Sequence, residues 1–154
     1  MEKQIVISES CEEKYQHYEH AVGTIMMRLE WCTKYRYKMF RKEENKNLLS
    51  ACIRRAASMH EIKIIELNVQ PEHIHCVVLV RFSFSASRVL QLLKGVSAKI
   101  FFEHKEKARL RYPKGHLWSR GKFASSVGFV QLDVVRNYIR TQDEHHSSSG
   151  NSTL

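Results

Sequence analysis

Apolar and polar positions follow two different periods along the chain, and together they predict alternating strands and helices. Runs rich in β-branched and aromatic residues, or with strict apolar–polar alternation, are typical of strands, whereas apolar residues three and four positions apart indicate helices. The predicted strands cover residues 20–33, 61–69, 73–82 and 117–127. The predicted helices cover residues 47–60, 85–101 and about 131–145.

Turn and capping residues mark the ends of these elements. Pro71 and Glu72 separate two neighbouring strands, which predicts an antiparallel hairpin. Ser85 is a good N-cap for the helix that follows it. The charged run 104–111 is expected to fray the end of that helix, and residues 113–115, Pro-Lys-Gly, form a turn before the last strand.

The order is therefore strand, helix, strand, strand, helix, strand and a final helix. This order predicts an α+β, ferredoxin-like (RRM-like) fold, in which an antiparallel sheet carries helices on one face and a C-terminal helix follows. Residues 20–146 form the expected single domain, residues 1–19 a polar arm of unassigned role, and residues 147–154 a disordered, low-complexity tail. This frame also supports RNA-binding modules and metabolic enzymes, so it does not fix a function.

The charge narrows the class of partner. A formal net charge of +9 and a pI near 9.5 favour a polyanion, with nucleic acid first and an anionic membrane surface second. A basic protein without such a partner is the alternative. The four cysteines form no CxxC pair, which argues against a zinc knuckle. With no signal peptide and no apolar run of about 20 residues, we expect a cytoplasmic protein outside the membrane.

Two histidines separated by one apolar residue form the first candidate site. Successive strand residues point to opposite faces, so His73 and His75 share one face while Ile74 points into the core. Two imidazoles in this position can bind one metal ion. Two unrelated surface histidines are the alternative, since the chain has nine histidines.

The final helix carries a second candidate pair. Tyr138 and Gln142 are four residues apart and lie on one helical face. A phenol can act as a covalent nucleophile, and an amide oxygen suits a hard divalent cation. Read alone, Tyr138 is more simply a tyrosine that packs against the core.

Basic and aromatic residues alternate in a third segment. Positive charges between rings suit phosphates and unstacked bases, although a solvated loop with aromatic side chains packed on the sheet fits equally well. The residues are Trp31, Lys34, Tyr35, Arg36, Tyr37, Lys38, Arg41 and Lys42, and Trp118, Arg120, Lys122 and Phe123 repeat the composition.

Taken in order, these motifs resemble a known family. The segments WCTKYR, PEHIHCVV, LLKGVSAKI, LWSRGKFASSVG and VVRNYIRTQ are similar to those of the small single-tyrosine HUH transposases of insertion sequences, the TnpA type. The resemblance covers roughly residues 20–145. It implies that His73, His75 and Gln142 hold Mg²⁺ or Mn²⁺ and that Tyr138 attacks DNA. The products are a 5′-phosphotyrosine link and a free 3′-OH, and a 3′-OH of another strand later rejoins the DNA without ATP.

The resemblance also implies partners. Such enzymes are prokaryotic homodimers that bind single-stranded DNA with hairpins at the ends of the element, and Tyr138 of one chain can serve the histidines of the other. The candidates for DNA contact, named from charge and motif position, are Lys34, Tyr35, Arg36, Lys94, Lys99 and Arg120.

Two segments depart from the family pattern. Residues 1–19 are longer than its usual start, and the charged segment 104–114 is idiosyncratic. The alternatives are another HUH nicking endonuclease, a catalytically silent nucleic-acid-binding module, and a metal-dependent phosphoesterase without a covalent step. Only the last would tolerate loss of Tyr138 while still cleaving.

Overall fold

Four antiparallel strands form the main sheet of the computed structural model, which describes residues 17–18, 21–22, 24–128 and 136–142. The strands are β3 (Ile25–Thr33), β4 (Lys63–Val69), β5 (His73–Val80) and β6 (Trp118–Ser126), in the order β4-β5-β3-β6. All three neighbouring pairs are antiparallel, including the predicted β4–β5 hairpin. Strands β1 (His17–Tyr18) and β2 (Ala21–Val22) pair separately. The ferredoxin-like prediction is therefore confirmed.

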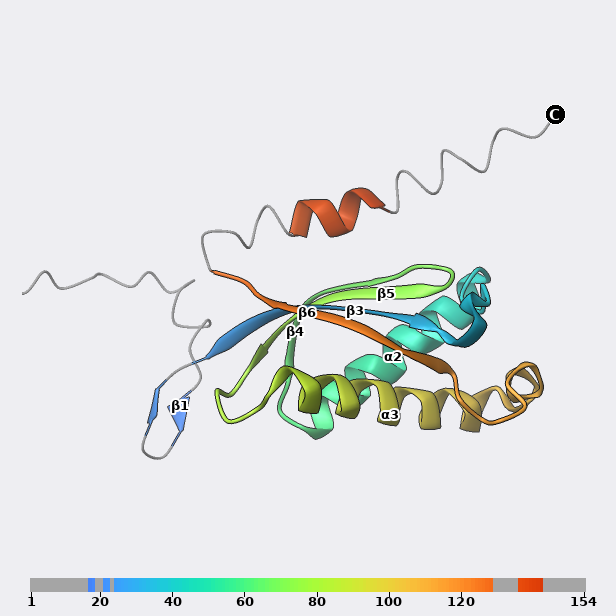
Figure 1. Ribbon diagram of the computed structural model, residues 1–154, viewed down its shortest axis with the longest axis horizontal. Helices are drawn as coiled ribbons and strands as arrows, with labels where there is room; N and C mark the ends of the chain where they lie inside the picture. Colours follow the sequence, from blue (N-terminus) through green and yellow to red (C-terminus); the bar gives the residue numbers. More distant parts are fainter. Residues whose placement is uncertain (1–16, 19–20, 23, 129–135, 143–154) are drawn as a thin grey trace, which may run out of the picture.

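Two long helices cover one face of this sheet. Helices α2 (Glu43–Met59) and α3 (Ala86–His104) lie side by side beneath it in Figure 1. Alternate strand residues such as Leu29, Ile74 and Val78 point toward the helices and are fully buried. They meet Ile53 of α2 and other apolar helix residues in one continuous core.

Element boundaries differ from the sequence prediction where polar residues take regular structure. Helix α2 begins at Glu43, four residues before the predicted start, because its first turn is polar and carries no apolar period. Ser85 caps α3 as predicted, and its Oγ accepts a hydrogen bond from the Arg88 amide at 3.1 Å. Helix α3 continues to His104, and the segment expected to fray instead forms a 3₁₀ helix, η2 (Glu106–Arg111).

The opposite face of the sheet carries a single short helix among the described residues, at 136–142 (Figure 1). Ile139 is fully buried there and joins Met26, Val77, Leu79 and Val127 in a second, smaller apolar cluster. The rest of the helix predicted at 131–145, most of the predicted arm and the predicted tail lie outside the described residues. No helix in the described ranges is long and apolar enough to cross a membrane.

Candidate functional site

The two histidines of β5 lie on the sheet face opposite α2 and α3. Their ring centroids are 4.7 Å apart, and Ile74 between them is fully buried on the helix-covered face. His75 is only 5% exposed, so it is no ordinary surface histidine. The strand alternation thus places both imidazoles where they can share one ligand.

A carboxylate contacts the Nδ1 atom of each histidine. Glu72 Oε1 lies 2.9 Å from Nδ1 of His73, and the Glu30 carboxylate contacts Nδ1 of His75 from the adjacent strand β3. The Glu30 contact lacks the alignment of a hydrogen bond, so within the described chain neither ring nitrogen of His75 has a hydrogen-bond partner. Carboxylates behind imidazoles orient metal-binding histidines and leave Nε2 for the ion.

The surroundings of His75 keep its ring neutral. Burial lowers the pKa of His75 to about 4, and the positive charges of His73 and Arg28 act in the same direction. An imidazole with a pKa this low is uncharged near pH 7, the form in which histidine binds a metal.

Neither carboxylate was predicted from the sequence. Glu72 precedes His73 directly, and that adjacency was an available signal. Glu30 pairs with His75 only through the β3–β5 register, which joins residues 45 positions apart and cannot be read from either strand alone.

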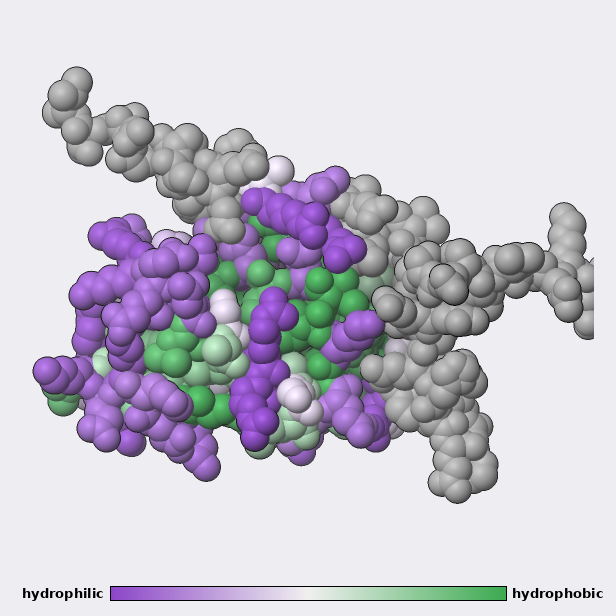
Figure 2. All heavy atoms as spheres, turned by 180° about the vertical axis from the view of Figure 1, so that it is seen from behind, coloured by the Kyte–Doolittle hydropathy of each residue, from purple (hydrophilic) through white to green (hydrophobic). Residues whose placement is uncertain are grey.

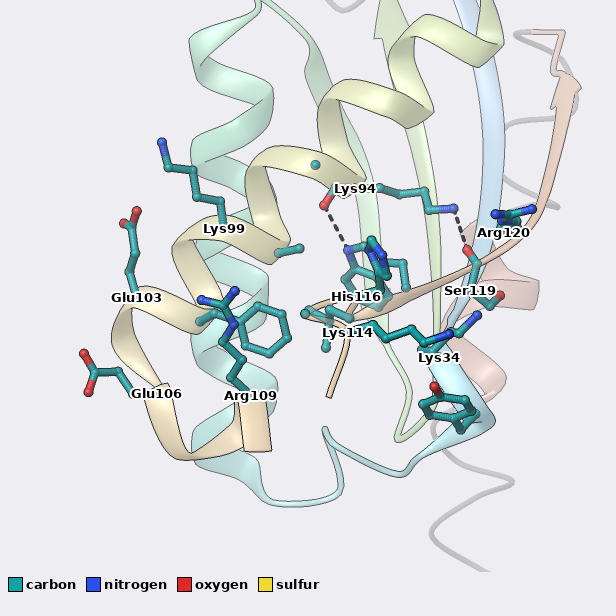
Figure 3. Close-up of a pocket in the computed structure, with 17 residues that line it drawn as sticks. Lys34, Lys94, Lys99, Glu103, Glu106, Arg109, Lys114, His116, Ser119 and Arg120 are labelled. Carbon is teal, nitrogen blue, oxygen red and sulfur yellow. Dashed lines mark hydrogen bonds between the residues drawn. The ribbon is translucent and has the colours of Figure 1, made fainter. Parts of the chain in front are cut away.

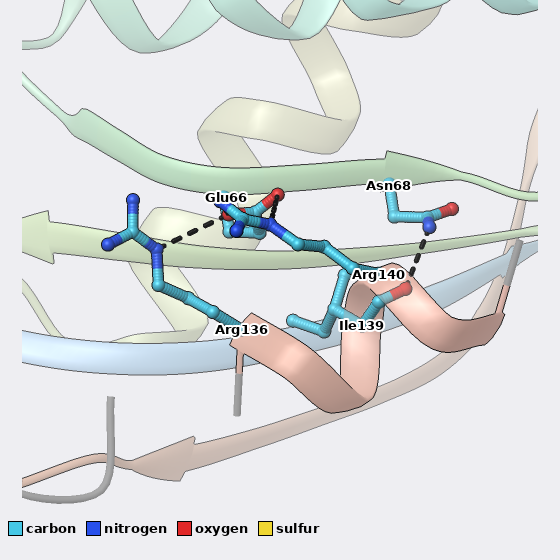
Figure 4. Close-up of polar contacts among 5 residues, drawn as sticks. All are labelled: Glu66, Asn68, Arg136, Ile139 and Arg140. Carbon is cyan, nitrogen blue, oxygen red and sulfur yellow. Dashed lines mark hydrogen bonds and ion pairs between the residues drawn. The ribbon is translucent and has the colours of Figure 1, made fainter. Parts of the chain in front are cut away.

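The helix at 136–142 lies against the strand next to the histidines. The Asn68 side-chain amide donates a hydrogen bond of 2.9 Å to the backbone carbonyl of Ile139 (Figure 4). Asn68 of β4 is the direct cross-strand partner of His75. This contact, together with the buried Ile139 side chain, fixes the helix above the part of the sheet that carries His75.

Glu66 of β4 forms a second attachment for this helix. Arg136 Nε lies 3.3 Å and Arg140 Nη2 lies 3.0 Å from Oε2 of Glu66, whose side chain is 15% exposed (Figure 4). The two arginines are four residues apart and therefore lie on one face of the helix. One carboxylate thus binds both ends of a single helical turn.

Tyr138 and Gln142 belong to this attached helix. Tyr138 is 51% exposed and so is accessible to a substrate. The Oε1 atom of Gln142 is buried and, within the part of the chain that the structure describes, has no hydrogen-bond partner. The described residues contain no group of three or more His, Cys, Asp or Glu side chains that could hold a metal. An amide oxygen such as Oε1 of Gln142 is a type of ligand that suits a hard divalent cation.

Five of the six predicted DNA contacts line one groove of about 1280 Å³ between α3, η2 and the start of β6 (Figure 3). We call it the first groove. The five are Lys34, Tyr35, Lys94, Lys99 and Arg120, and Arg109 and Lys114 add further positive charge. Phe102 and the exposed Tyr35 ring supply aromatic surface, while Glu103 and Glu106 are the acidic lining residues.

Both tryptophans of the basic–aromatic motifs, and one lysine named as a DNA contact, have structural contacts. Trp31 and Trp118 are buried in the core with their rings 5.9 Å apart. Lys94 Nζ donates to the backbone carbonyl of Ser119 at 2.9 Å, which ties α3 to β6 (Figure 3). Burial, followed by the charge of Lys122, lowers the pKa of Lys94. The packing interpretation is thus correct for the tryptophans, and Lys94 is partly a structural residue.

Comparison with known proteins identifies the family. Residues 21–142 match the sequence profile of IS200-like transposases. The chain belongs to the IS200-like transposase family. It is a DNA transposase of this type, as the sequence resemblance indicated. Within the family, it is 25% identical over 111 residues to the transposase for insertion sequence element IS200 of Salmonella typhimurium, covering 72% of each chain. It is 24% identical over 116 residues to the ISDra2 transposase TnpA of Deinococcus radiodurans, covering 75% of this chain and 82% of that one.

Two solved structures share the fold. A candidate transposase from Deinococcus radiodurans R1 superposes with a TM-score of 0.65 at 22% identity, covering 82% of this chain and 97% of that chain. A REP-associated tyrosine transposase bound to a REP hairpin gives a TM-score of 0.59 at 14% identity, covering 85% of this chain and 74% of that chain.

Proposed function

We propose that this transposase cleaves and rejoins single-stranded DNA at the ends of an insertion sequence, with Tyr138 as the nucleophile. One observation carries the proposal. The helix that bears Tyr138 is fixed by Asn68, and Asn68 is the cross-strand neighbour of His75. The exposed phenol and the histidine pair are therefore held on the same face of one sheet.

The covalent step exchanges one phosphate ester bond for another, so it needs no outside energy source. The Tyr138 oxygen attacks the scissile phosphorus and loses its proton, while the bond from phosphorus to the 3′ oxygen breaks and that oxygen takes up a proton. The products are a 5′-phosphotyrosine link and a free 3′-OH. A 3′-OH of another strand reverses the step and rejoins the DNA.

In this proposal His73, His75 and Gln142 hold a divalent cation, Mg²⁺ or Mn²⁺. Three observations support it: the paired imidazoles, the carboxylates on their Nδ1 atoms, and the unpaired oxygen of Gln142. The bound cation would stabilise the negative charge that develops on the phosphate. The hydrogen bond to Glu72 would fix the direction of the His73 ring, and the Glu30 carboxylate adds negative charge beside His75.

The first groove is the proposed site for the DNA hairpin. Lys34, Lys99 and Arg120 supply charges for phosphates, and Tyr35 supplies an exposed ring for an unpaired base. The REP-associated relative was solved with a REP hairpin, which supports a hairpin as the ligand. We also propose that the chain acts as a homodimer.

Covalent capture of DNA tests the nucleophile. We expect Tyr138→Phe to form no denaturant-resistant adduct with a labelled single strand that spans the ends of the element, while DNA binding stays near the wild-type level. Tyr35→Phe is the matched control, since it removes the same hydroxyl from another exposed tyrosine and leaves Tyr138 intact. Adducts that persist in Tyr138→Phe would exclude this tyrosine.

The same assay separates the alternatives. Replacing both His73 and His75 by alanine should abolish metal-dependent cleavage, and full cleavage by that variant in the presence of a chelator would exclude the metal site. Cleavage without an adduct in the wild type would indicate a phosphoesterase. Binding without cleavage would indicate a silent binding module.

A further inference from the structure

A second basic cleft lies beside the first groove and contains none of its lining residues. It has a volume of about 740 Å³ and is formed by the segment before α2, the first turn of α2 and the region around η2. Seven of its lining side chains are basic and one is acidic; the basic ones are Arg36, Lys38, Arg41, Lys42, Lys105, Lys107 and Arg111. We call it the second cleft.

Within the described residues, most of these basic side chains have no ion-pair partner. The single acidic lining residue, Glu44, pairs with Lys105. Arg111 lies over the Tyr37 ring, 4.9 Å from its centroid. The remaining five, Arg36, Lys38, Arg41, Lys42 and Lys107, form no ion pair with any residue in the described ranges. Like charges gathered in a concave surface repel each other unless an anion is present.

The backbone beneath these charges is firmly held. Phe40 is buried between the exposed Lys38 and Arg41, and its amide donates to the Pro71 carbonyl at 3.0 Å. The Asn45 side chain donates to the Met39 carbonyl at 3.1 Å. A fixed backbone keeps the flanking cations at the cleft at little entropic cost on binding.

The 3₁₀ helix η2 separates the two basic surfaces. With three residues per turn, Glu106 and Arg109 share the side that lines the first groove, whereas Ala108 and Arg111 share the side that lines the second cleft. The charged segment that departs from the family pattern therefore contributes an arginine to each surface.

Two adjacent residues before α2 also line different surfaces. Tyr35 lines the first groove and Arg36 the second cleft. Both have positive φ, 60° and 51°, a left-handed conformation that is uncommon and strained for residues other than glycine. With these conformations the Tyr35 side chain lines the first groove and the Arg36 side chain lines the second cleft.

We infer that the second cleft is a further binding site for nucleic-acid phosphates, and that it holds the backbone of the same DNA whose hairpin occupies the first groove. The inference rests on the proposed function, because it takes DNA as the polyanion. Hydrophilic side chains (purple) gather at the left of Figure 2, the end of the molecule where α2 begins, which agrees with a charged surface there.

The salt dependence of binding tests this site. The triple variant Lys38→Gln, Arg41→Gln, Lys107→Gln removes three exposed charges from the second cleft. The probe is a fluorescein-labelled DNA hairpin of arbitrary stem sequence with a single-stranded tail, and the readout is fluorescence anisotropy over a salt series. We expect the slope of log K against log salt to become shallower by roughly three, about one for each lost phosphate contact.

A charge-matched control distinguishes phosphate binding in the second cleft from the general effect of the protein's net positive charge. The variant Arg54→Gln, Arg55→Gln, Arg88→Gln removes the same net charge from exposed positions that line neither surface. We expect its slope to change by less than about one. Equal changes in the two triple variants would overturn the second cleft as a site. Thermal unfolding of each variant verifies that it is folded.

The outcome also distinguishes this inference from the proposed function. If the wild type forms the Tyr138 adduct but the second-cleft variant has the wild-type slope, the second cleft alone is refuted. If the wild type binds the hairpin with the expected slope difference but forms no adduct, the cleavage proposal fails and the phosphate site stands.

Discussion

The carboxylate of Glu72 gives a prediction about a single side chain. Glu72 binds Nδ1 of His73 at 2.9 Å and fixes the direction of the imidazole. Glu72→Gln keeps the shape but replaces the carboxylate that contacts Nδ1 with a neutral amide, which holds the imidazole less firmly. We expect the affinity for Mn²⁺ to fall roughly 10- to 100-fold, measured by titration calorimetry with the purified protein.

Glu103→Gln is the control for Glu72→Gln. Glu103 lies on α3 and lines the first groove, on the sheet face that the helices cover. Its substitution removes the same charge and leaves the histidine pair untouched. Equal Mn²⁺ affinity in the two variants would contradict a role of Glu72 in orienting the metal ligand.

Single residues also show what the sequence could reveal. The HxH spacing alone predicted that His73 and His75 share a face, because alternation is a local property of a strand. Charge and motif position also named five residues that line the first groove in the structure, although the groove itself was not predicted. Arg36 was named with these residues, but in the structure it lines the second cleft instead of the first groove. Tyr35 and Arg36 both have positive φ, so the chain turns there and the two side chains line different surfaces. The pattern of charges along the sequence does not predict such a turn.

At the scale of elements, the attachment of the tyrosine helix to Glu66 is the most testable contact. Glu66→Gln weakens both arginine contacts and leaves Asn68 and Ile139 to hold the helix. A displacement of about 1 Å at a nucleophile can cost on the order of 100-fold in rate. We expect the single-turnover rate of adduct formation to fall between roughly 10- and 100-fold while the Kd for DNA stays unchanged.

Glu61→Gln tests whether the loss of any carboxylate–arginine pair would do the same. Glu61 pairs with Arg81, away from the helix. It should leave the rate of adduct formation at the wild-type level, while hydrogen exchange at residues 136–142 should be faster only in Glu66→Gln. A fall in DNA affinity that matches the fall in rate would show that Glu66 acts on binding instead of on the tyrosine.

The elements themselves were largely predictable, and the exceptions have physical causes. Apolar period and Ser85 identified α3, but the period ends where η2 begins, and a 3₁₀ helix of six residues leaves no clear pattern. The first turn of α2 is polar because it faces solvent, so periodicity could not find it. The attachment of residues 136–142 to β4 depends on contacts about 70 residues apart, and no local pattern encodes them.

On the scale of the whole molecule, the question is which chain supplies the tyrosine. Within the described residues, the helix lies on its own sheet, held by Asn68, Glu66 and the buried side chain of Ile139. These contacts predict a site complete within one chain. The test combines a Tyr138→Phe chain with a His73→Ala, His75→Ala chain, each with a different affinity tag, and purifies the mixed dimer through both tags in turn.

Neither chain of that mixed dimer has both halves of the site, so a site built within one chain gives no adduct. A site shared between chains would restore one of the two sites in each mixed dimer, about half the wild-type adduct per dimer. Because the contacts of Glu66 and Asn68 favour attachment within the chain, we expect no recovery. Recovery to about half would show that the helix leaves its own sheet and completes the partner's site. Failure to isolate any mixed dimer would contradict the homodimer, and the tyrosine would then have to act within its own chain.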